Sequence, residues 1–292
     1  MVARLSILAA AVLFGTTGTA QALSHVHAPL GVGAARIAVG GTLLAAAAAG
    51  TGGFTGLRHH LGAVLAAGGG VAVYQTAFFA ALAATGVTIG TVVAIGAAPV
   101  LTGALEWAVV RRRPGLRWVA ATVPAALGVA VLGLGAGGST VAPAGVALAL
   151  LASFGYAVYA VLGKRLLDAG ARPMGVMGAT FGVGAVLLAP VAATAGRAAL
   201  AEPRGLLLVV YLGLVPTALA YVLFARALRE LPASETATFG LAEPLTAAVL
   251  AFAVLGERPG VVPLLGAGLI LLALGVLAAP RRDVLEPVPV PS

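Results

Sequence analysis

The sequence predicts an all-α membrane protein with ten transmembrane helices, arranged as two inverted five-helix repeats. Of the 292 residues, 61% are hydrophobic and only 9% are charged, and the mean hydropathy is +1.08. A soluble domain carries about 25% charged residues, so this chain lacks the polar surface that water requires. The apolar residues form long runs without the two-residue alternation of strands, and one pattern occurs in both halves of the chain.

Clusters of Arg, Pro and Gly divide the chain into apolar spans of about 18–25 residues, the length that crosses a bilayer. The predicted spans are 5–24, 30–49, 61–83, 87–110, 118–136, 144–163, 174–195, 206–228, 234–255 and 261–279. They form a first repeat, 1–136, and a second repeat, 144–279. The remaining tail, 280–292, is expected to be disordered and cytoplasmic because it is short and rich in Pro and Val.

The first span also has a second interpretation. Arg4, the apolar run after it and the small residues around Gln21 are typical of a cleaved signal peptide. The repeat favours retention of this span, because Phe14-Gly15 matches Phe154-Gly155 at the head of the second half. Cleavage would also leave the first repeat one span short. We therefore expect the first span to be a helix of the folded protein.

The repeat is clearest around two prolines. An offset of 145 residues aligns 98–115, APVLTGALEWAVVRRRPG, with 243–260, EPLTAAVLAFAVLGERPG, so that Pro99 matches Pro244. With a rise of about 1.5 Å per residue, both prolines lie near the middle of a hydrocarbon core about 30 Å thick. A proline frees the carbonyl four residues earlier, so each is predicted to break its helix. The break is either a simple packing kink or part of a polar site.

Positive charge is distributed unevenly between the loops. With a cytoplasmic N-terminus, 13 of the 17 Lys and Arg residues fall in inner segments and 3 in outer ones, while Arg36 lies within a span. The inner residues are Arg4, Arg58, Arg111, Arg112, Arg113, Arg117, Lys164, Arg165, Arg172, Arg226, Arg229, Arg281 and Arg282. This bias predicts that both termini are cytoplasmic. It also accounts for the net charge of +8, so nucleic-acid binding is not expected.

Glu243 is the strongest candidate for a functional residue. A carboxylate at the bilayer centre costs about 2.5–3.5 kcal/mol on insertion scales, so it requires an aqueous cavity or a partner. Its counterpart in the first repeat is Ala98, so duplication does not explain its presence. Glu243 either anchors a substrate, with proton coupling as an option, or makes a structural hydrogen bond to a neighbouring helix.

Other polar residues at middle depth are expected to line a substrate cavity. Most are too large to be satisfied easily within their own helix: Tyr74, Gln75, Tyr156, Tyr221, Thr16 and Arg36. Arg36 either attracts an anion, pairs with a carboxylate or extends to the membrane surface. Glu106 lies about four residues from the inner end of its span, where we expect a structural role near the arginines 111–113.

Metal and nucleotide chemistry find no support in the sequence. The chain has no cysteine, which excludes disulfides and thiolate metal sites. The histidines occur as His25 and His27 and as His59 and His60, without acidic companions that would complete a metal site. No phosphate-binding motif of the G-x-x-x-x-G-K-[ST] type occurs, so ATP hydrolysis is not expected. We predict that the protein uses no cofactor.

Together these features resemble the EamA-type drug/metabolite transporter superfamily. The resemblance rests on the two-copy pattern, on Phe14-Gly15 and Phe154-Gly155, and on the run LAEPLTAAVLAFAVLGER at 241–258. The first copy departs from it, with Arg112 where the second copy has Glu257. The resemblance covers nearly the whole chain. It implies a ten-helix secondary transporter, in a family of which many members export amino acids or other small metabolites.

Three functions compete for this sequence. The first is a secondary transporter that exports small polar or zwitterionic metabolites by alternating access. The second is proton-driven efflux of lipophilic cations, for which an aromatic content of 5% supplies little material for a cation cage. The third is an intramembrane enzyme, which would need a cluster of reactive groups that these scattered carboxylates do not form. We predict the first: a multi-pass cell-membrane transporter, not an enzyme, whose partners are a small-molecule substrate and the lipid bilayer.

Overall fold

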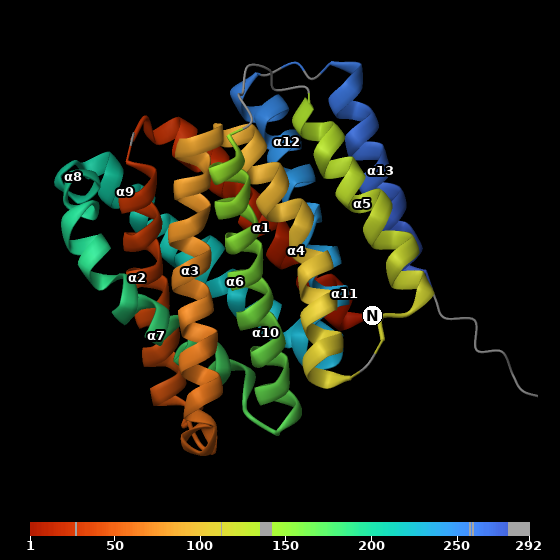
Figure 1. Ribbon diagram of the computed structural model, residues 1–292. Helices are drawn as coiled ribbons and strands as arrows, with labels where there is room; N and C mark the ends of the chain where they lie inside the picture. The colour runs from red at the N-terminus through yellow and green to blue at the C-terminus, as the bar shows by residue number, and fades with distance from the viewer. Residues whose placement is uncertain (27, 112, 135–141, 257, 259, 280–292) are drawn as a thin grey trace, which may run out of the picture.

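The computed structural model describes residues 1–26, 28–111, 113–134, 142–256, 258 and 260–279, and in these residues the protein is helical without strands (Figure 1). The first half contains α1 (Val2–Ser24), α2 (Pro29–Gly50), α3 (Leu61–Thr85), α4 (Val87–Val110) and α5 (Leu116–Leu134), with a short 3-10 turn, η1 (Leu57–His60), before α3. The second half contains α6 (Pro143–Asp168), α7 (Pro173–Thr194), α8 (Gly196–Ala201), α9 (Pro203–Gly213), the π-helical segment η2 (Leu214–Leu219), α10 (Ala220–Glu230), α11 (Ala233–Gly240), α12 (Ala242–Leu255) and α13 (Val261–Ala278).

The described residues form ten helical stretches that are long and apolar enough to cross a membrane, which confirms the predicted all-α membrane fold. Three of these stretches are composite: η1 and α3 form one, α9, η2 and α10 form a second, and α11 and α12 form a third. Most predicted bounds lie within three residues of the observed ones. The exception is α6, which continues beyond the predicted end at residue 163, because the pair Lys164–Asp168 (2.9 Å) supports its last turn.

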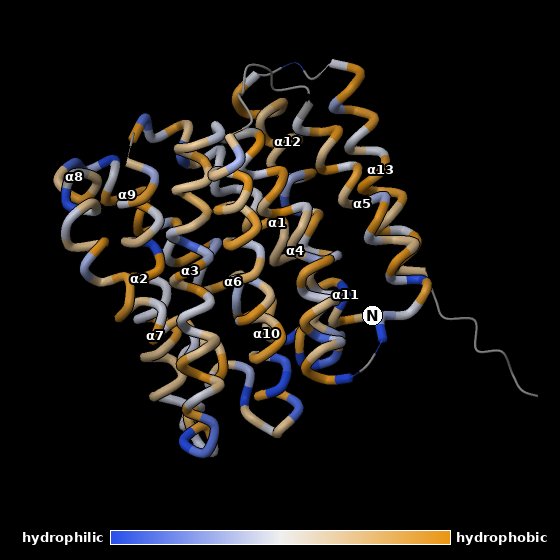
Figure 2. The backbone as a smooth tube through the Cα atoms, in the orientation of Figure 1, coloured by the Kyte–Doolittle hydropathy of each residue, from blue (hydrophilic) through white to orange (hydrophobic). Residues whose placement is uncertain are grey.

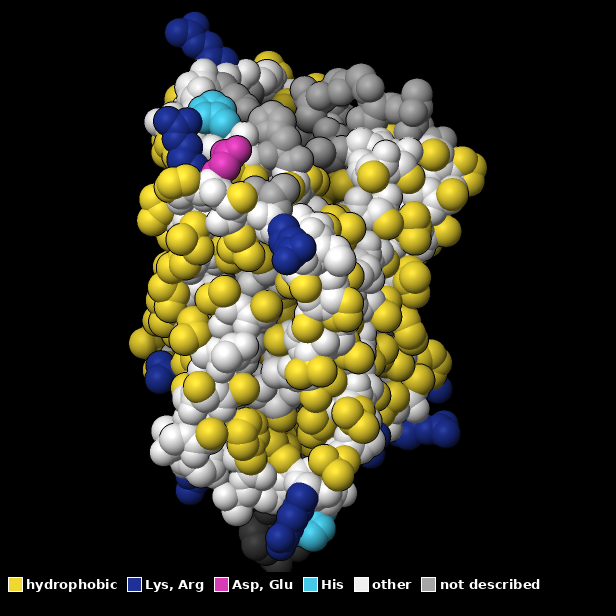
Figure 3. Space-filling model, turned by 90° about the vertical axis from the view of Figure 1, so that its left-hand side faces the viewer, with side chains coloured by type: hydrophobic (Ala, Val, Ile, Leu, Met, Phe, Trp, Pro, Cys, Tyr) yellow, Lys and Arg dark blue, Asp and Glu magenta, His cyan; other side chains and the backbone are white. Residues whose placement is uncertain are grey.

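The outer surface of the bundle is apolar, as a lipid-facing surface requires. Many large aliphatic side chains are exposed. On the face in Figure 3 hydrophobic side chains predominate in the middle, while Lys and Arg gather mainly towards the two ends. The backbone coloured by hydropathy shows the same distribution, with hydrophilic residues concentrated in the turns (Figure 2). The α5–α13 pair lies at one edge of the bundle (Figure 1). The first span is an integral part of the bundle, since α1 packs against α10 and α12.

Glycines allow the central helices to approach closely. A Cβ added at Gly70 of α3 would lie 2.7 Å from the carbonyl oxygen of Gly155 on α6, and a Cβ at Gly155 would lie 2.7 Å from that of Gly70. Small residues are the usual means of close helix packing in membranes. The α3–α6 contact therefore depends on both glycines.

Several of the predicted inner segments meet at one end of the bundle. Arg4 donates to the carbonyl of Ala278 (2.7 Å), and Arg117 donates to the carbonyl of Val276 (3.0 Å). Two guanidinium groups thus interact with the free carbonyls at the C-terminal end of α13, where positive charge is favourable. The N-terminus, the start of α5 and the end of α13 share this end of the bundle (Figure 1). We refer to it as the terminal end.

We predict that the terminal end faces the cytoplasm. A cysteine replacing Gly260, which is exposed between α12 and α13, is expected to react with an impermeant maleimide in intact cells. A cysteine replacing Gly115, which is exposed before α5, is expected to react only after the cells are opened. Because the chain contains no other cysteine, each signal reports one position. The opposite labelling pattern would contradict the positive-inside assignment.

Candidate functional site

The two aligned prolines occupy different backbone environments. Pro244 lies in the first turn of α12, just after a break at Leu241, where a turn separates α11 from α12. Pro99, in contrast, lies inside α4, which continues without interruption, so the predicted break is absent there. Ser153 of α6 donates to the carbonyl of Ala94 (2.5 Å), which is not the carbonyl that Pro99 frees, so this contact joins α6 to α4 beside the proline without replacing the lost bond.

A second irregular segment was not predicted. The π-helical segment η2 interrupts the eighth span around the buried Pro216. Thr217 donates from Oγ1 to the carbonyl of Leu212, five residues earlier (2.8 Å). Pro216 in the middle of an apolar span was the signal that could have revealed this segment, since prolines and π-bulges are the usual causes of helix irregularity. Breaks of this kind are common at functional sites.

Arg36 and Gln75 meet inside the bundle. Arg36 of α2 donates from Nη2 to Oε1 of Gln75 on α3 (3.3 Å). Arg36 Nε and Gln75 Nε2 are buried and have no hydrogen-bond partner in the structure. Gly33 makes room for this contact, because a Cβ there would lie 2.1 Å from Gln75 Nε2. The Arg36 charge therefore has one neutral partner and unused donor capacity.

A cluster of aromatic rings begins beside this contact, at Tyr74, which precedes Gln75 on α3. The aromatic cluster consists of Phe14, Tyr74, Tyr156, Tyr159, Phe181, Tyr221 and Phe224. The ring centroids of Tyr156 lie 6.3 Å from Tyr74 and 5.0 Å from Tyr159, and the hydroxyls of Tyr159 and Tyr221 are 3.4 Å apart. Tyr159 is buried, whereas Tyr74, Tyr156 and Tyr221 are only partly buried. The cluster joins five helices: α1, α3, α6, α7 and α10.

The predicted tyrosines belong to this cluster, but its phenylalanines and Tyr159 were not selected from the sequence. Phe181 and Phe224 are buried, and an apolar residue in an apolar span carries no signal that separates it from other core positions. Tyr159 lies at middle depth beside Tyr156 in the sequence, which was the available signal. Its hydroxyl pairs with that of Tyr221, as buried tyrosines usually require.

Glu243 lies in the first turn of α12, directly after the helix break, and is partly buried. Its carboxylate is near enough to Arg36 and Tyr74 to interact with them electrostatically. No ion pair within 4.0 Å joins Glu243 to any other described residue. The break also brings the Tyr156 hydroxyl beside the backbone, 3.9 Å from a Cβ built at Gly240. Glu243, Arg36, Gln75 and the aromatic cluster therefore belong to one interior region.

Thr16, the remaining predicted residue, is engaged in a separate contact. Its hydroxyl accepts a hydrogen bond from Tyr211 Oη of α9 (2.8 Å) and donates to the carbonyl of Leu13 (2.7 Å). Both its donor and one acceptor position are thus used within the protein. Thr16 joins α1 to α9 in the structure, and only its second acceptor position is left for a substrate. Tyr211 itself was not selected from the sequence.

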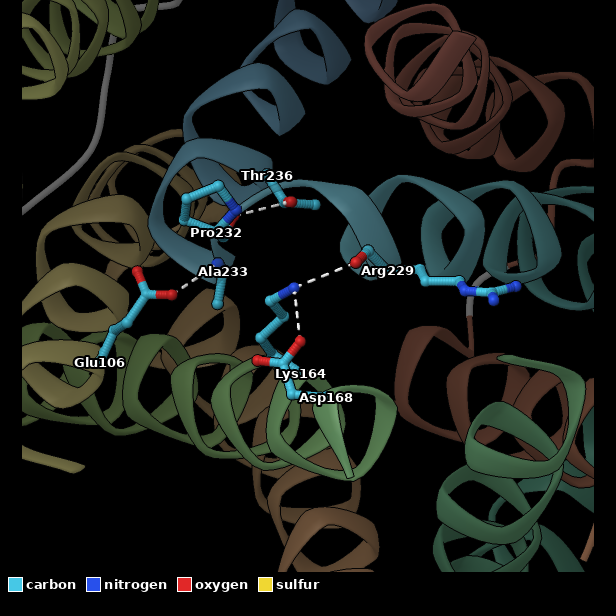
Figure 4. A network of polar contacts seen from close by, with 7 residues as sticks. All are labelled: Glu106, Lys164, Asp168, Arg229, Pro232, Ala233 and Thr236. Carbon is cyan, nitrogen blue, oxygen red and sulfur yellow. Dashed lines mark hydrogen bonds and ion pairs between the residues drawn. The ribbon is translucent and has the colours of Figure 1, made fainter. Parts of the chain in front are cut away.

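Glu106 forms no ion pair with Arg111 or Arg113, the described arginines near which a structural role was expected, and its partners lie instead at the start of α11. Its Oε1 accepts from the backbone N–H of Ala233 (2.8 Å), and its Oε2 accepts from the N–H of Ser234 (3.0 Å) and from the Ser234 hydroxyl (2.5 Å). Figure 4 shows the carboxylate directed at this helix terminus. The first N–H groups of a helix lack internal partners and carry partial positive charge, so they attract a buried carboxylate.

Comparisons with known proteins agree with this architecture. The EamA-like transporter family matches residues 1–134 and again residues 143–279. "Uncharacterized transporter YwfM" from Bacillus subtilis (strain 168) is 38% identical over 286 residues, which cover 96% of this chain and 95% of that protein. A solved structure described as "Crystal structure of protein" is similar in fold, with a TM-score of 0.80 at 22% identity over 94% of this chain and 96% of that chain.

Proposed function

Because the chain belongs to the EamA-like transporter family, we propose that it is a secondary transporter that exports small zwitterionic metabolites, such as amino acids, by alternating access. Membership makes the protein a multi-pass membrane transporter. The substrate class, the outward direction and the mechanism are the parts that we propose. The observation that carries the proposal is the pair of opposite charges, Arg36 and Glu243, that lie in one interior region without forming an ion pair.

A zwitterion complements both of these charges. Buried charges are costly unless they are paired and hydrogen-bonded. The carboxylate of a zwitterion would accept from the guanidinium of Arg36, whose Nε is unused, and its ammonium would donate to the carboxylate of Glu243. Each end of the substrate would then neutralise one protein charge. The partly buried tyrosines 74, 156 and 221 would contact the rest of the substrate.

The aromatic cluster supports a second candidate, efflux of lipophilic cations. Tyrosine and phenylalanine faces attract cations, and the structure gathers more rings in one place than the low aromatic content suggested. A cation would neutralise Glu243, but it would leave Arg36 without an anion and would be repelled by it. The zwitterion satisfies both groups, so we favour it.

The relation between the two halves supports alternating access. The family matches each half separately, and the contacts are reciprocal: α3 of the first half packs on α6, while α10 of the second half packs on α1. In each case the third span of one half contacts the first span of the other. We propose that these halves, 1–136 and 144–279, are inverted repeats that exchange conformations during transport.

We predict that transport requires both charged groups of the substrate. Liposomes that contain the purified protein would be loaded with a mixture of the twenty amino acids, and their loss would be followed by mass spectrometry. For each amino acid that is transported, the decarboxylated amine and the deaminated acid would be tested next. We expect the zwitterion to be transported at least about tenfold faster than either analogue, because each analogue leaves one protein charge unpaired. Equal or faster transport of the amines would instead support cation efflux, and loss of none of the amino acids would contradict the proposed substrate class.

A further inference from the structure

The start of α11 is held by a residue from the other half of the chain. No side chain of its own segment caps α11. The three hydrogen bonds at Ala233 and Ser234 come instead from Glu106, which lies on α4. Glu106 and Ser234 are both buried, so water does not compete for these bonds. A hydrogen bond to a charged acceptor is among the stronger ones in proteins, and here three share one carboxylate.

The segment that Glu106 holds is bounded by irregular backbone on both sides. Residues 220–240 comprise α10, a short turn and α11, and they form a helical hairpin. The hairpin begins after the π-helical segment η2 and ends at the break at Leu241. The C-terminal end of α10 is also held, because Lys164 of α6 donates to the carbonyl of Arg229 (3.1 Å; Figure 4). Such breaks let a segment rotate without unfolding, because they absorb the change in backbone angles.

The hairpin carries part of the candidate site. Tyr221 lies near the start of α10, and Gly240, which approaches the Tyr156 hydroxyl, ends α11. The tip of the hairpin lies at the same end of the bundle as the N-terminus (Figure 1). A rotation about the two breaks would therefore move the wall between the site and the terminal end. Glu106 opposes this rotation, since it connects the tip to α4.

From this geometry we propose that Glu106 is a latch that closes the terminal end of the transporter, and that its release from α11 opens a path from the site to that end. The proposal rests on the proposed transport function, to which it adds the residue that controls access from one side. Release exposes both the carboxylate and the helix N–H groups, so it becomes favourable only when water enters. The latch thus couples the start of α11 to the opening of the bundle.

We expect Glu106→Gln to increase access to α11 from the terminal end. Ala237, buried on α11 one turn beyond the latch, would be replaced by cysteine in this otherwise cysteine-free chain. The labelling rate with an impermeant maleimide would be measured in inverted membrane vesicles. The amide keeps one acceptor but loses the charge and the second acceptor, so labelling should become at least about tenfold faster. Glu230→Gln, at an exposed carboxylate on the end of α10, is the matched control and should leave the rate unchanged.

An unchanged labelling rate in Glu106→Gln would overturn the latch. A second experiment applies if that variant does not fold: cysteines at 106 and 234 would be joined by a short bifunctional methanethiosulfonate. The joined protein should lose transport, and a reductant should restore it. Transport at an unchanged rate after complete joining would show that the contact between α4 and α11 persists throughout the cycle. That result would also overturn the latch. The labelling assay uses no substrate, so a failure of amino-acid transport would refute the proposed function and leave the labelling result standing.

Discussion

Replacing Glu243 with Gln is expected to reduce transport of a zwitterionic substrate by about ten- to a hundredfold in kcat/KM, while expression and membrane insertion stay close to normal. The factor corresponds to the loss of one charge-assisted hydrogen bond to the substrate ammonium. Glutamine has nearly the same shape, and Glu243 makes no ion pair in the described protein that the change would disrupt. The measurement is uptake or exchange in liposomes at several substrate concentrations.

The same variant distinguishes two functional roles for Glu243 from a merely structural hydrogen bond. If the carboxylate anchors the substrate, exchange of substrate across the membrane falls together with net transport. If it carries a proton, Glu243→Gln abolishes transport driven by a pH gradient but preserves substrate exchange. Full activity and a normal pH dependence in well-folded protein would mean that neither role is correct. Glu202→Gln, at an exposed carboxylate between α8 and α9, provides the control for a loss of negative charge as such.

The ten spans could be predicted because the signal for a membrane helix is local. A run of apolar residues of bilayer length has no alternative in hydrocarbon but to form a helix, so composition and length suffice. The C-terminal end of α6 could not be predicted in this way, because charged residues extend the helix beyond its apolar run. Lys164 and Asp168 are charged and so appeared to belong to a loop, yet their ion pair and the contact of Lys164 with Arg229 extend the helix.

The site was predicted in part, because polar residues in apolar spans are few and costly. Arg36, Gln75, Glu243 and the three predicted tyrosines meet in one region of the structure. Thr16 does not share their contacts, since a threonine hydroxyl is small enough to be satisfied by its own helix and one neighbour. Which residues pair could not be predicted, because pairing depends on how the spans pack.

The contact of Glu106 with α11 illustrates the same limit. Its distance from the end of its own span suggested the nearby arginines as partners. The structure instead brings the start of α11 to α4, and this packing places unpaired N–H groups beside the carboxylate. A helix terminus inside a bundle has a larger unmet need for an acceptor than arginines that can reach water. Only the tertiary arrangement reveals that need.

Adding a single methyl group at Gly70 is expected to destabilise the protein by about 1–3 kcal/mol, the usual cost of overpacking. A Cβ there would lie 2.7 Å from the carbonyl oxygen of Gly155 and 3.2 Å from the backbone nitrogen of Tyr159. Both are backbone atoms, so rotation of a side chain cannot relieve the clash, and α3 must move away from α6. Because Tyr74 and Tyr156 lie on these two helices, the movement should also lower the affinity for substrate.

Gly69→Ala is the matched control for Gly70→Ala, because the two glycines are neighbours on α3 and a Cβ at Gly69 meets no atom within 4 Å. Alanine favours a helix over glycine by up to about 1 kcal/mol, so Gly69→Ala should leave stability unchanged or raise it. Gly70→Ala is thus expected to lower the free energy of unfolding, whereas Gly69→Ala is expected to leave it unchanged or raise it. Unfolding in mixed detergent and SDS micelles would measure both. The geometry at Gly70 requires Gly70→Ala to have the lower free energy of unfolding of the two variants. Equal free energies would mean that the close α3–α6 contact does not limit stability.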